Sequence, residues 1–193
     1  MPRATPFRLT VHPLTPARWP DLVRLFGASG ACAGCWCMWP RRSAAEFRRD
    51  KGTANRRAFR RVVTAGPPPG VLGYAGSAPA GWCAVAPREA YPRLERSKVM
   101  ARVDAQPVWS VSCFFVARGF RRQGLALPLL QGAVALASRH GARIVEAYPN
   151  DPETRAADVF VWMGLADTFR AAGFAEVARR SPTRPIMRLA IDR

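Results

Sequence analysis

The chain has 193 residues, of which 49% are hydrophobic, and 30 Lys and Arg side chains against 13 Asp and Glu give a formal net charge of +17. This length and hydrophobic content predict one folded domain over residues 1–193 with a sizeable core, and they exclude a mostly disordered chain. The longest apolar runs contain only a few residues, far fewer than the roughly 20 that cross a bilayer. We therefore expect no membrane-spanning helix.

The N-terminus and the cysteines both favour a cytoplasmic protein. The segment Met1–Arg8 carries charge, but no apolar stretch follows it, so it does not resemble a signal peptide. The cysteines are odd in number, and Cys32, Cys35 and Cys37 stand too close together to link distant elements. We expect reduced thiols.

The positive charge comes almost entirely from arginine, since Lys51 and Lys98 are the only lysines. Arginine binds phosphate and carboxylate groups with planar, bidentate geometry, so a phosphate-bearing ligand or a nucleic acid would suit this surface. The arginines are scattered, however, and no basic stripe alternates with aromatic residues. Binding of RNA or DNA is therefore the less favoured alternative.

The first predicted elements are a strand and a group of short helices. Residues 7–11 alternate apolar and polar side chains as a strand does, and the apolar spacing over 22–26 predicts a short helix. Ser43 and Glu46 have the spacing of a capping box at the start of a helix predicted over 43–63, which Gly52 could divide.

A hairpin and a long loop follow. The segment 66–70 is rich in proline and glycine and must be a loop, after which 71–74 and 80–86 read as two strands of a hairpin. Residues 87–107 are polar and lack a sustained period, and their length makes them a candidate functional loop.

The C-terminal half alternates strands and helices, so the chain as a whole reads as an α/β (α+β) fold. Residues 108–116 are the strongest predicted strand, and 124–140 have the spacing of an amphipathic helix. The remaining predicted elements are a strand over 142–147, a helix over 159–172, and strands over 174–180 and 186–191.

The turn between the strongest strand and its helix is a candidate anion site. It is basic, and Gly124 within it lets a ligand approach the backbone closely. The first N–H groups of a helix lack internal partners, and the helix dipole is positive there, so a phosphate group would bind. A Walker A loop is excluded because Leu125 and Ala126 stand where Lys and Ser or Thr would follow, and the chain contains no Gly-x-Gly-x-x-Gly.

This turn resembles the pyrophosphate-binding pattern Gln/Arg-x-x-Gly-x-Gly/Ala of the GNAT superfamily of N-acetyltransferases. The strand before it ends in Phe-Phe-Val, an Ala- and Leu-rich helix follows, and a later helix ends in Gly173-Phe174, as is common in that family. The order of elements is also similar over nearly the whole chain. The resemblance implies the GNAT fold, with a central mixed, mostly antiparallel sheet whose middle strands splay apart between flanking helices.

The resemblance also implies that acetyl-CoA is a co-substrate, bound by the core over 108–141. Its pyrophosphate would lie on the backbone N–H groups of the turn and its pantetheine arm along the preceding strand, where one N–H would polarise the thioester carbonyl. The residues expected to contact it are Phe114, Phe115, Val116, Arg121, Arg122, Gln123, Gly124, Leu125, Ala126 and Phe169.

Acetyl transfer in such a protein requires a neutral amine, and a carboxylate acting through water usually takes its proton. Candidates are Glu146, which is a charge inside an apolar strand, Glu89 at the start of the long loop, and Asp158. Two of them have structural alternatives: Glu146 could be an edge-facing or paired carboxylate, and Glu89 could pair with Arg88 or Arg93 on the surface.

The chain departs from the family pattern at two positions. Phe169 stands where GNAT proteins commonly have the tyrosine that protonates the leaving thiolate, and Trp162 stands where an asparagine often binds pantetheine. Tyr148 or bulk water could supply the proton instead. A non-catalytic CoA-binding or regulatory module therefore remains the alternative function.

The acceptor amine would belong to a small molecule or a protein that the sequence does not identify. In similar proteins the segment corresponding to 27–70 shapes the acceptor site, and here it is helical and cysteine-rich. Its cysteines have thiolate spacing that suits zinc but no fourth ligand nearby, so pocket lining is preferred over a metal site or a disulfide. Trp82, Trp109 and the long loop would complete the wall. Homodimers are common among similar proteins, but no exposed apolar helix indicates one here.

Overall fold

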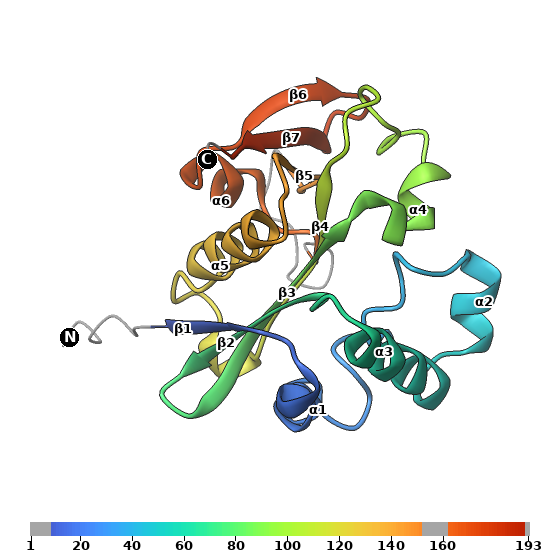
Figure 1. The fold of residues 1–193 in the computed structure, drawn as a ribbon, viewed down its shortest axis with the longest axis vertical. Helices are drawn as coiled ribbons and strands as arrows, with labels where there is room; N and C mark the ends of the chain where they lie inside the picture. The colour runs from blue at the N-terminus through green and yellow to red at the C-terminus, as the bar shows by residue number, and fades with distance from the viewer. Residues whose placement is uncertain (1–8, 152–161, 192–193) are drawn as a thin grey trace.

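The computed structural model describes residues 9–151 and 162–191. Its strands are β1 (Leu9–Pro13), β2 (Gly70–Ala75), β3 (Ala78–Pro87), β4 (Trp109–Val116), β5 (Ile144–Ala147), β6 (Ala175–Arg179) and β7 (Pro185–Ala190). They form one sheet in the order β1-β2-β3-β4-β5-β7-β6 (Figure 1). Among the described strands, β4 and β5 pair in parallel and the other neighbours pair antiparallel. This confirms the predicted α/β fold with a mixed, mostly antiparallel sheet.

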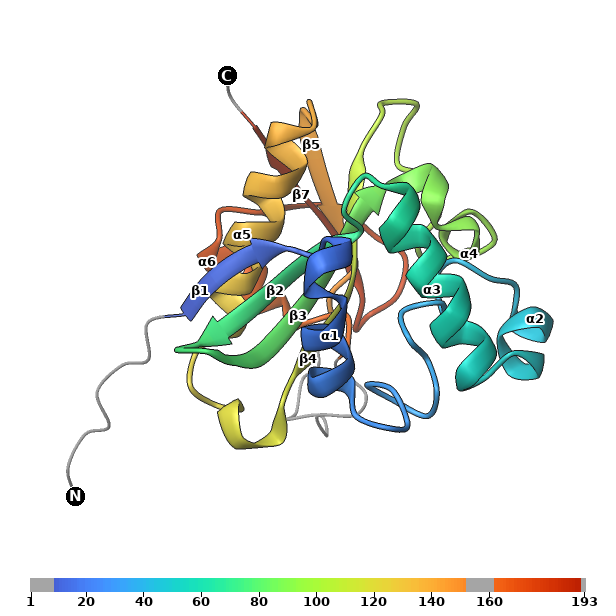
Figure 2. The ribbon, with the colours of Figure 1, turned by 60° about the horizontal axis from the view of Figure 1, so that its bottom comes forward.

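Helices cover both faces of the sheet (Figure 2). They are α1 (Trp19–Phe26), α2 (Ala44–Arg49), α3 (Thr53–Ala65), α4 (Pro92–Glu95), α5 (Ala126–Arg139) and α6 (Ala166–Ala171). On one face, Leu129 of α5 and Phe169 of α6 belong to one buried cluster. On the other face, Leu22 of α1 and Phe59 of α3 pack with Trp82 of β3. In the part of the chain with described coordinates, no helix is long and apolar enough to span a membrane.

The helical segment before the hairpin follows the predicted pattern. The backbone N–H of Glu46 donates to Ser43 Oγ at 3.3 Å, and the backbone N–H of Ser43 donates to Glu46 Oε2 at 2.9 Å, which confirms the capping box. The helix predicted over 43–63 divides at Gly52, whose φ is +79°, into α2 and α3. The long loop contains two short helical turns, Arg88–Ala90 and α4.

The helix predicted over 159–172 was wrong in its first part. Residues 159–161 lie outside the described residues, and Trp162–Leu165 is not helical, because Gly164 has φ +87° and Leu165 forms a bridge with Asn150. The helix α6 begins at Ala166, whose N–H donates to the Asn150 carbonyl at 2.9 Å. A long-range backbone pairing has therefore overridden the local helical periodicity.

The two middle strands of the sheet separate near the middle of β4. Their last paired residues are Val111 of β4 and Ala147 of β5. On the other side of β4, Cys113 faces Ala84 and Val111 faces Val85, so Ser112 is an extra residue and forms a β-bulge. The strand β4 continues to Val116 beside β3 alone. The expected splay is present, and it begins at this bulge.

The strand β1 lies directly against α5 at Gly132, where an added Cβ would overlap Cγ1 of Val11. Alanine is favoured over glycine inside a helix by about 1 kcal/mol, whereas overpacking a well-packed contact costs about 1–3 kcal/mol. We expect Gly132→Ala to lower the free energy of unfolding by about 1 kcal/mol, the balance of these two effects. Urea denaturation of the wild-type protein and the variant measures this change in the free energy of unfolding.

The matched control is the same substitution in a Val11→Ala background. There Cγ1 is gone and only the Cβ of residue 11 stays close, 3.0 Å from the added Cβ, so Gly132→Ala should lower the free energy of unfolding less than it does in the wild-type background. An increase in stability from Gly132→Ala in the wild-type background would contradict the close packing of β1 on α5.

Candidate active site

The turn after β4 leads into the uncapped N-terminus of α5. A short helical turn, Arg118–Phe120, is followed by Arg122 with φ +61° and Gly124 with φ +76°. Leu125 is the N-cap of α5 and offers no side-chain acceptor to the first N–H groups. The turn is exposed over residues 121–124. This is the backbone geometry predicted for an anion site.

The backbone donors of this turn point to what it can bind. Across the described residues, no acceptor receives a hydrogen bond from the backbone N–H groups of Arg122 to Leu127. A Cβ added at Gly124 would meet no atom within 4 Å, so the space in front of that residue is open. Arg121 Nε donates to the Val116 carbonyl and Gln123 Nε2 to the Gly119 carbonyl, each at 3.0 Å, which holds the turn in place. These unused donors at the positive end of a helix fit a pyrophosphate.

The residues expected to bind pantetheine lie at the end of β4 with their side chains on both faces of the sheet. The ring of Phe114 contacts that of Phe169 on the α5 face, with centroids 5.8 Å apart, and the ring of Phe115 contacts that of Phe26 on the opposite face, with centroids 5.5 Å apart. The backbone N–H of Phe114 donates to the Trp162 carbonyl at 2.6 Å. The Trp162 carbonyl therefore already accepts the hydrogen bond of one backbone N–H that the family resemblance assigns to pantetheine.

Phe169, at the position of the family's usual tyrosine, is fully buried. Its ring also contacts that of Phe174, with centroids 5.2 Å apart. It thus belongs to the hydrophobic core between α5, α6 and the sheet.

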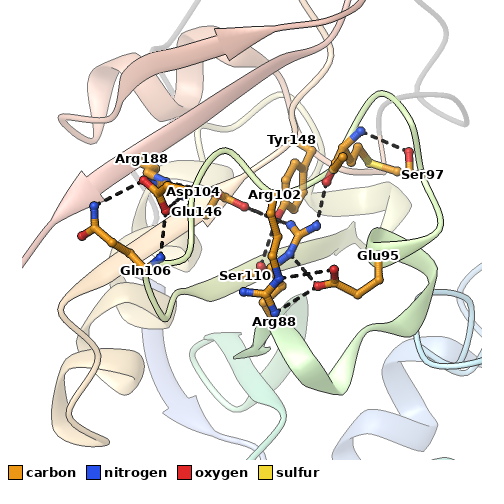
Figure 3. A network of polar contacts seen from close by, with 12 residues as sticks. Arg88, Glu95, Ser97, Arg102, Asp104, Gln106, Ser110, Glu146, Tyr148 and Arg188 are labelled. Atoms are coloured by element: carbon orange, nitrogen blue, oxygen red, sulfur yellow. Dashed lines mark hydrogen bonds and ion pairs between the residues drawn. The ribbon is translucent and has the colours of Figure 1, made fainter.

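Glu146 lies in a buried network of charges (Figure 3). Arg88 Nη1 donates to Glu146 Oε1 at 3.0 Å, and Arg188 Nε donates to Glu146 Oε2 at 2.7 Å. The hydroxyl of Tyr148 contacts both Arg88 and Glu146 and is 3.0 Å from Ser110 Oγ. Burial beside this carboxylate raises the pKa of Tyr148 well above its usual value. Glu146 and Tyr148, the two predicted catalytic residues in this network, are therefore engaged in ion pairs or hydrogen bonds. This fits the paired-carboxylate alternative for Glu146.

The same network fastens the long loop to the sheet. Arg88 Nη2 donates to the Met100 carbonyl at 2.8 Å and its Nε to Glu95 at 2.9 Å. Arg188 binds Asp104 with both terminal nitrogens, at 2.6 and 3.0 Å, and this contact lowers the pKa of Asp104 to about 2. Sequence reasoning missed the buried roles of both arginines. The available signal was Glu146 itself, because a carboxylate inside an apolar strand requires a positive partner.

Glu89 lies apart from this network on the surface. Its side chain is 61% exposed and pairs with Arg102 at 2.8 Å. The hydrogen bond from Arg102 lowers the pKa of Glu89, which makes the carboxylate a weaker base. The surface pairing considered for Glu89 is thus present with a different arginine. Asp158 lies outside the described residues.

The cysteine-rich segment packs on the face opposite α5. All five cysteines are free thiols. Burial raises the pKa of Cys35 to about 11 and that of Cys37 well above its usual value, so these thiols stay protonated at neutral pH. Among the described residues, no group of three His, Cys, Asp or Glu side chains could hold a metal ion.

Aromatic and arginine side chains extend from this segment to the splayed strands. The ring of Trp39 contacts that of Trp162, with centroids 4.4 Å apart, and the guanidinium of Arg93 lies over Trp39 at 4.4 Å. Trp82 is buried on the same face, whereas Trp109 stacks on His140 and packs with the cluster on the α5 face. Trp109 is therefore not part of the predicted acceptor wall.

The two candidate carboxylates should respond very differently to substitution. Glu146→Gln removes the buried carboxylate that Arg88 and Arg188 share, and breaking a buried pair costs about 3–5 kcal/mol. Glu89→Gln removes an exposed pair, which contributes about 0–1 kcal/mol. We expect chemical denaturation to show a large loss of stability for Glu146→Gln and almost none for Glu89→Gln. Equal stability of the two variants would contradict the network.

The comparisons with known proteins agree with this geometry. Residues 30–164 match the sequence model of the acetyltransferase (GNAT) family. No curated protein matches the chain by sequence.

Solved structures share the fold over nearly its whole length. A GNAT-family acetyltransferase from Streptococcus agalactiae has a TM-score of 0.57 at 14% identity, covering 96% of each chain. A GCN5-related N-acetyltransferase from Kribbella flavida has a TM-score of 0.55 at 19% identity, covering 97% of this chain and 100% of the other. PaiA N-acetyltransferase from Thermoplasma acidophilum, in complex with coenzyme A, has a TM-score of 0.52 at 11% identity, covering 95% and 99%. By its fold and by the family match over most of its length, the chain belongs to the GNAT family of acetyl-CoA-dependent N-acetyltransferases.

Proposed function

We propose that this protein transfers the acetyl group of acetyl-CoA to an amine of a small molecule or a protein by direct attack of the amine on the thioester. The observation that supports this most is the turn after β4. Directly beyond the splayed part of the sheet, it places two positive-φ residues, an uncapped helix end and a run of backbone N–H groups that have no acceptor among the described residues. Each of these features suits a pyrophosphate.

In this proposal the pyrophosphate lies on the N–H groups of residues 122–127, and Arg121 and Arg122 add positive charge beside it. The pantetheine arm follows β4 toward the bulge at Ser112. To reach the N–H of Phe114, it must replace the hydrogen bond that this N–H now makes with the Trp162 carbonyl. A backbone N–H near the bulge then polarises the thioester carbonyl as charge develops on its oxygen.

We assign Glu146 and Tyr148 a structural role within this proposal, because their polar atoms are buried and bound to Arg88, Arg188 and Ser110. Glu89 is accessible, but its pairing with Arg102 lowers its pKa and weakens it as a base. The amine would therefore enter in its neutral form. We propose the reducing cytoplasm as the compartment, which suits five free thiols.

The second candidate function is a CoA-binding module without turnover. The observation that favours it is Phe169, which is buried in the core at the position of the family's usual acid. An acetyl-CoA turnover assay with a panel of amines separates the two functions, since the module would bind acetyl-CoA and release no CoA.

The turn offers a direct test with a matched control on the same helix. Gly124 and Gly141 lie at opposite ends of α5, both have positive φ (+76° and +82°), and neither has an atom within 4 Å of an added Cβ. Gly124→Glu places a carboxylate against the proposed pyrophosphate, whereas Gly141→Glu imposes similar backbone strain far from it. We expect calorimetric titration with acetyl-CoA to show at least a roughly 100-fold loss of affinity for Gly124→Glu, about 2.7 kcal/mol, and wild-type affinity for Gly141→Glu.

Arg121→Ala should weaken binding less, by about tenfold, because one charge-assisted hydrogen bond is lost while the backbone donors remain. Equal affinities of Gly124→Glu and Gly141→Glu for acetyl-CoA would show that the pyrophosphate binds elsewhere.

A further inference from the structure

Two buried hydroxyl groups beside the β4 bulge have no hydrogen-bond partner among the described residues. Tyr91, immediately before α4, and Ser112, the extra residue of the bulge, are both fully buried. Within the described part of the chain, neither Tyr91 Oη nor Ser112 Oγ has a hydrogen-bond partner. The two side chains are close enough for Ser112 to affect the titration of Tyr91, although their geometry falls short of a hydrogen bond.

A second tyrosine and serine on the same part of the sheet show what a structural pair looks like. The hydroxyl of Tyr148 is 3.0 Å from Ser110 Oγ and also contacts Arg88 and Glu146. Most buried polar groups in proteins are satisfied in this way. An unsatisfied buried hydroxyl costs about 1–3 kcal/mol. Among the described residues, the Tyr91 hydroxyl has no comparable set of partners, so its burial is not compensated as that of Tyr148 is.

Ser112 lies on the stretch of β4 where the proposed chemistry takes place. Ser112 directly follows Val111, the last β4 residue that pairs with β5, and stands two residues before Phe114. The pantetheine arm in our proposed function runs along this stretch of β4 toward the bulge. The thioester would then reach the strand beside the Ser112 and Tyr91 hydroxyls.

We propose that Tyr91 and Ser112 form the proton path of the acetyl transfer, a role that rests on the proposed function. As the C–N bond to the acetyl carbon forms and the C–S bond breaks, Tyr91 donates its hydroxyl proton to the leaving sulfur. Ser112 donates its own hydroxyl proton to the Tyr91 oxygen and takes one proton from the attacking nitrogen in return. One proton moves from nitrogen to sulfur, both hydroxyls return to their starting state, and no other reactant is needed.

The surroundings of Tyr91 keep its hydroxyl able to donate. Burial raises the pKa of Tyr91, and this outweighs the opposite effects of Arg41 and of Ser112. The Arg41 guanidinium lies 4.9 Å from the centre of the Tyr91 ring. The hydroxyl is therefore protonated at neutral pH, as a general acid must be. Phe169 has no hydroxyl, and in this proposal Tyr91 supplies the acid from another element of the chain.

The segment beside Tyr91 carries backbone strain. Trp36 and Cys37 both have positive φ, +39° and +52°, which side chains of L-residues rarely adopt. The same segment continues to Pro40, whose carbonyl accepts the backbone N–H of Arg93 in α4 at 3.2 Å, and to Arg41 over the Tyr91 ring. Strain of this kind often lies beside functional sites, and here it borders the side of the sheet that carries the two unsatisfied hydroxyls.

The test is Tyr91→Phe, which keeps the ring and its contact with Arg41 and removes only the unsatisfied hydroxyl. The amine is the best acceptor from a panel of phenethylamine, spermidine, free amino acids and N-terminal peptides. With this amine and acetyl-CoA, we expect kcat to fall about 100-fold, which is within the range of general acid catalysis. The KM and calorimetric Kd for acetyl-CoA should stay within about twofold because the hydroxyl acts on the reacting atoms only. Ser112→Ala should lower kcat by about tenfold, at the lower end of the same effect.

Stability provides the readout independent of activity. Because the Tyr91 hydroxyl is buried without a partner, Tyr91→Phe should leave Tm unchanged or raise it, whereas Tyr148→Phe breaks three polar contacts and should lower Tm. A gain or no change in Tm together with a large loss of kcat is the expected signature. A merely structural hydroxyl would lower both.

The possible failures are distinguishable. Wild-type protein that binds acetyl-CoA and releases no CoA with any amine of the panel would overturn the proposed function, and the proton path with it. Wild-type turnover that survives Tyr91→Phe within about threefold, or a fall in Tm equal to that of Tyr148→Phe, would overturn the proton path alone.

Discussion

One buried carboxylate, Glu146, holds together the middle of this fold. Arg88, in the short helical turn after β3, and Arg188 of β7 both donate to it, so a single charge on β5 connects two strands of the sheet and the start of the long loop. A buried ion pair of this kind need not stabilise a fold more than apolar residues would. Its effect is on geometry, because only one arrangement satisfies all the donors that surround the carboxylate.

That arrangement determines where the sheet can open. Ser110, opposite Glu146 in the β4 and β5 ladder, takes part in the same network through Tyr148. The network therefore keeps the two parallel strands together just before Val111, where the pairing ends. Beyond that point the bulge turns β4 away, and the turn before α5 follows. The position of the proposed acetyl-CoA site thus depends on contacts at the opposite, closed end of the strand pair.

Local signals made the order of the elements and the glycine-bearing turn before α5 readable from the sequence. The capping box at Ser43, the hairpin and the glycine-bearing turn are each encoded within a few consecutive residues. The partners of Glu146 were not readable, because Arg88 is 58 residues away and Arg188 is 42 residues away in the chain. The bulge at Ser112 and the non-helical Trp162–Leu165 segment were also missed, since each arises from pairing with a distant strand or residue. Phe169 was recognised as a departure, yet only packing shows that it belongs to the core.

The hydrogen bond from Phe114 to the Trp162 carbonyl has a consequence for affinity. The Trp162 carbonyl is an acceptor of the kind that an amide-bearing ligand would offer. Such a ligand therefore competes with an acceptor from the same chain for the Phe114 N–H. For pantetheine bound as we propose, the measured dissociation constant is the intrinsic one divided by the fraction of molecules in which this bond is open. A substitution that weakens the packing of the Trp162 segment would tighten binding without contacting the ligand. In the proposed site, the strength of this internal hydrogen bond therefore influences how readily the protein releases CoA.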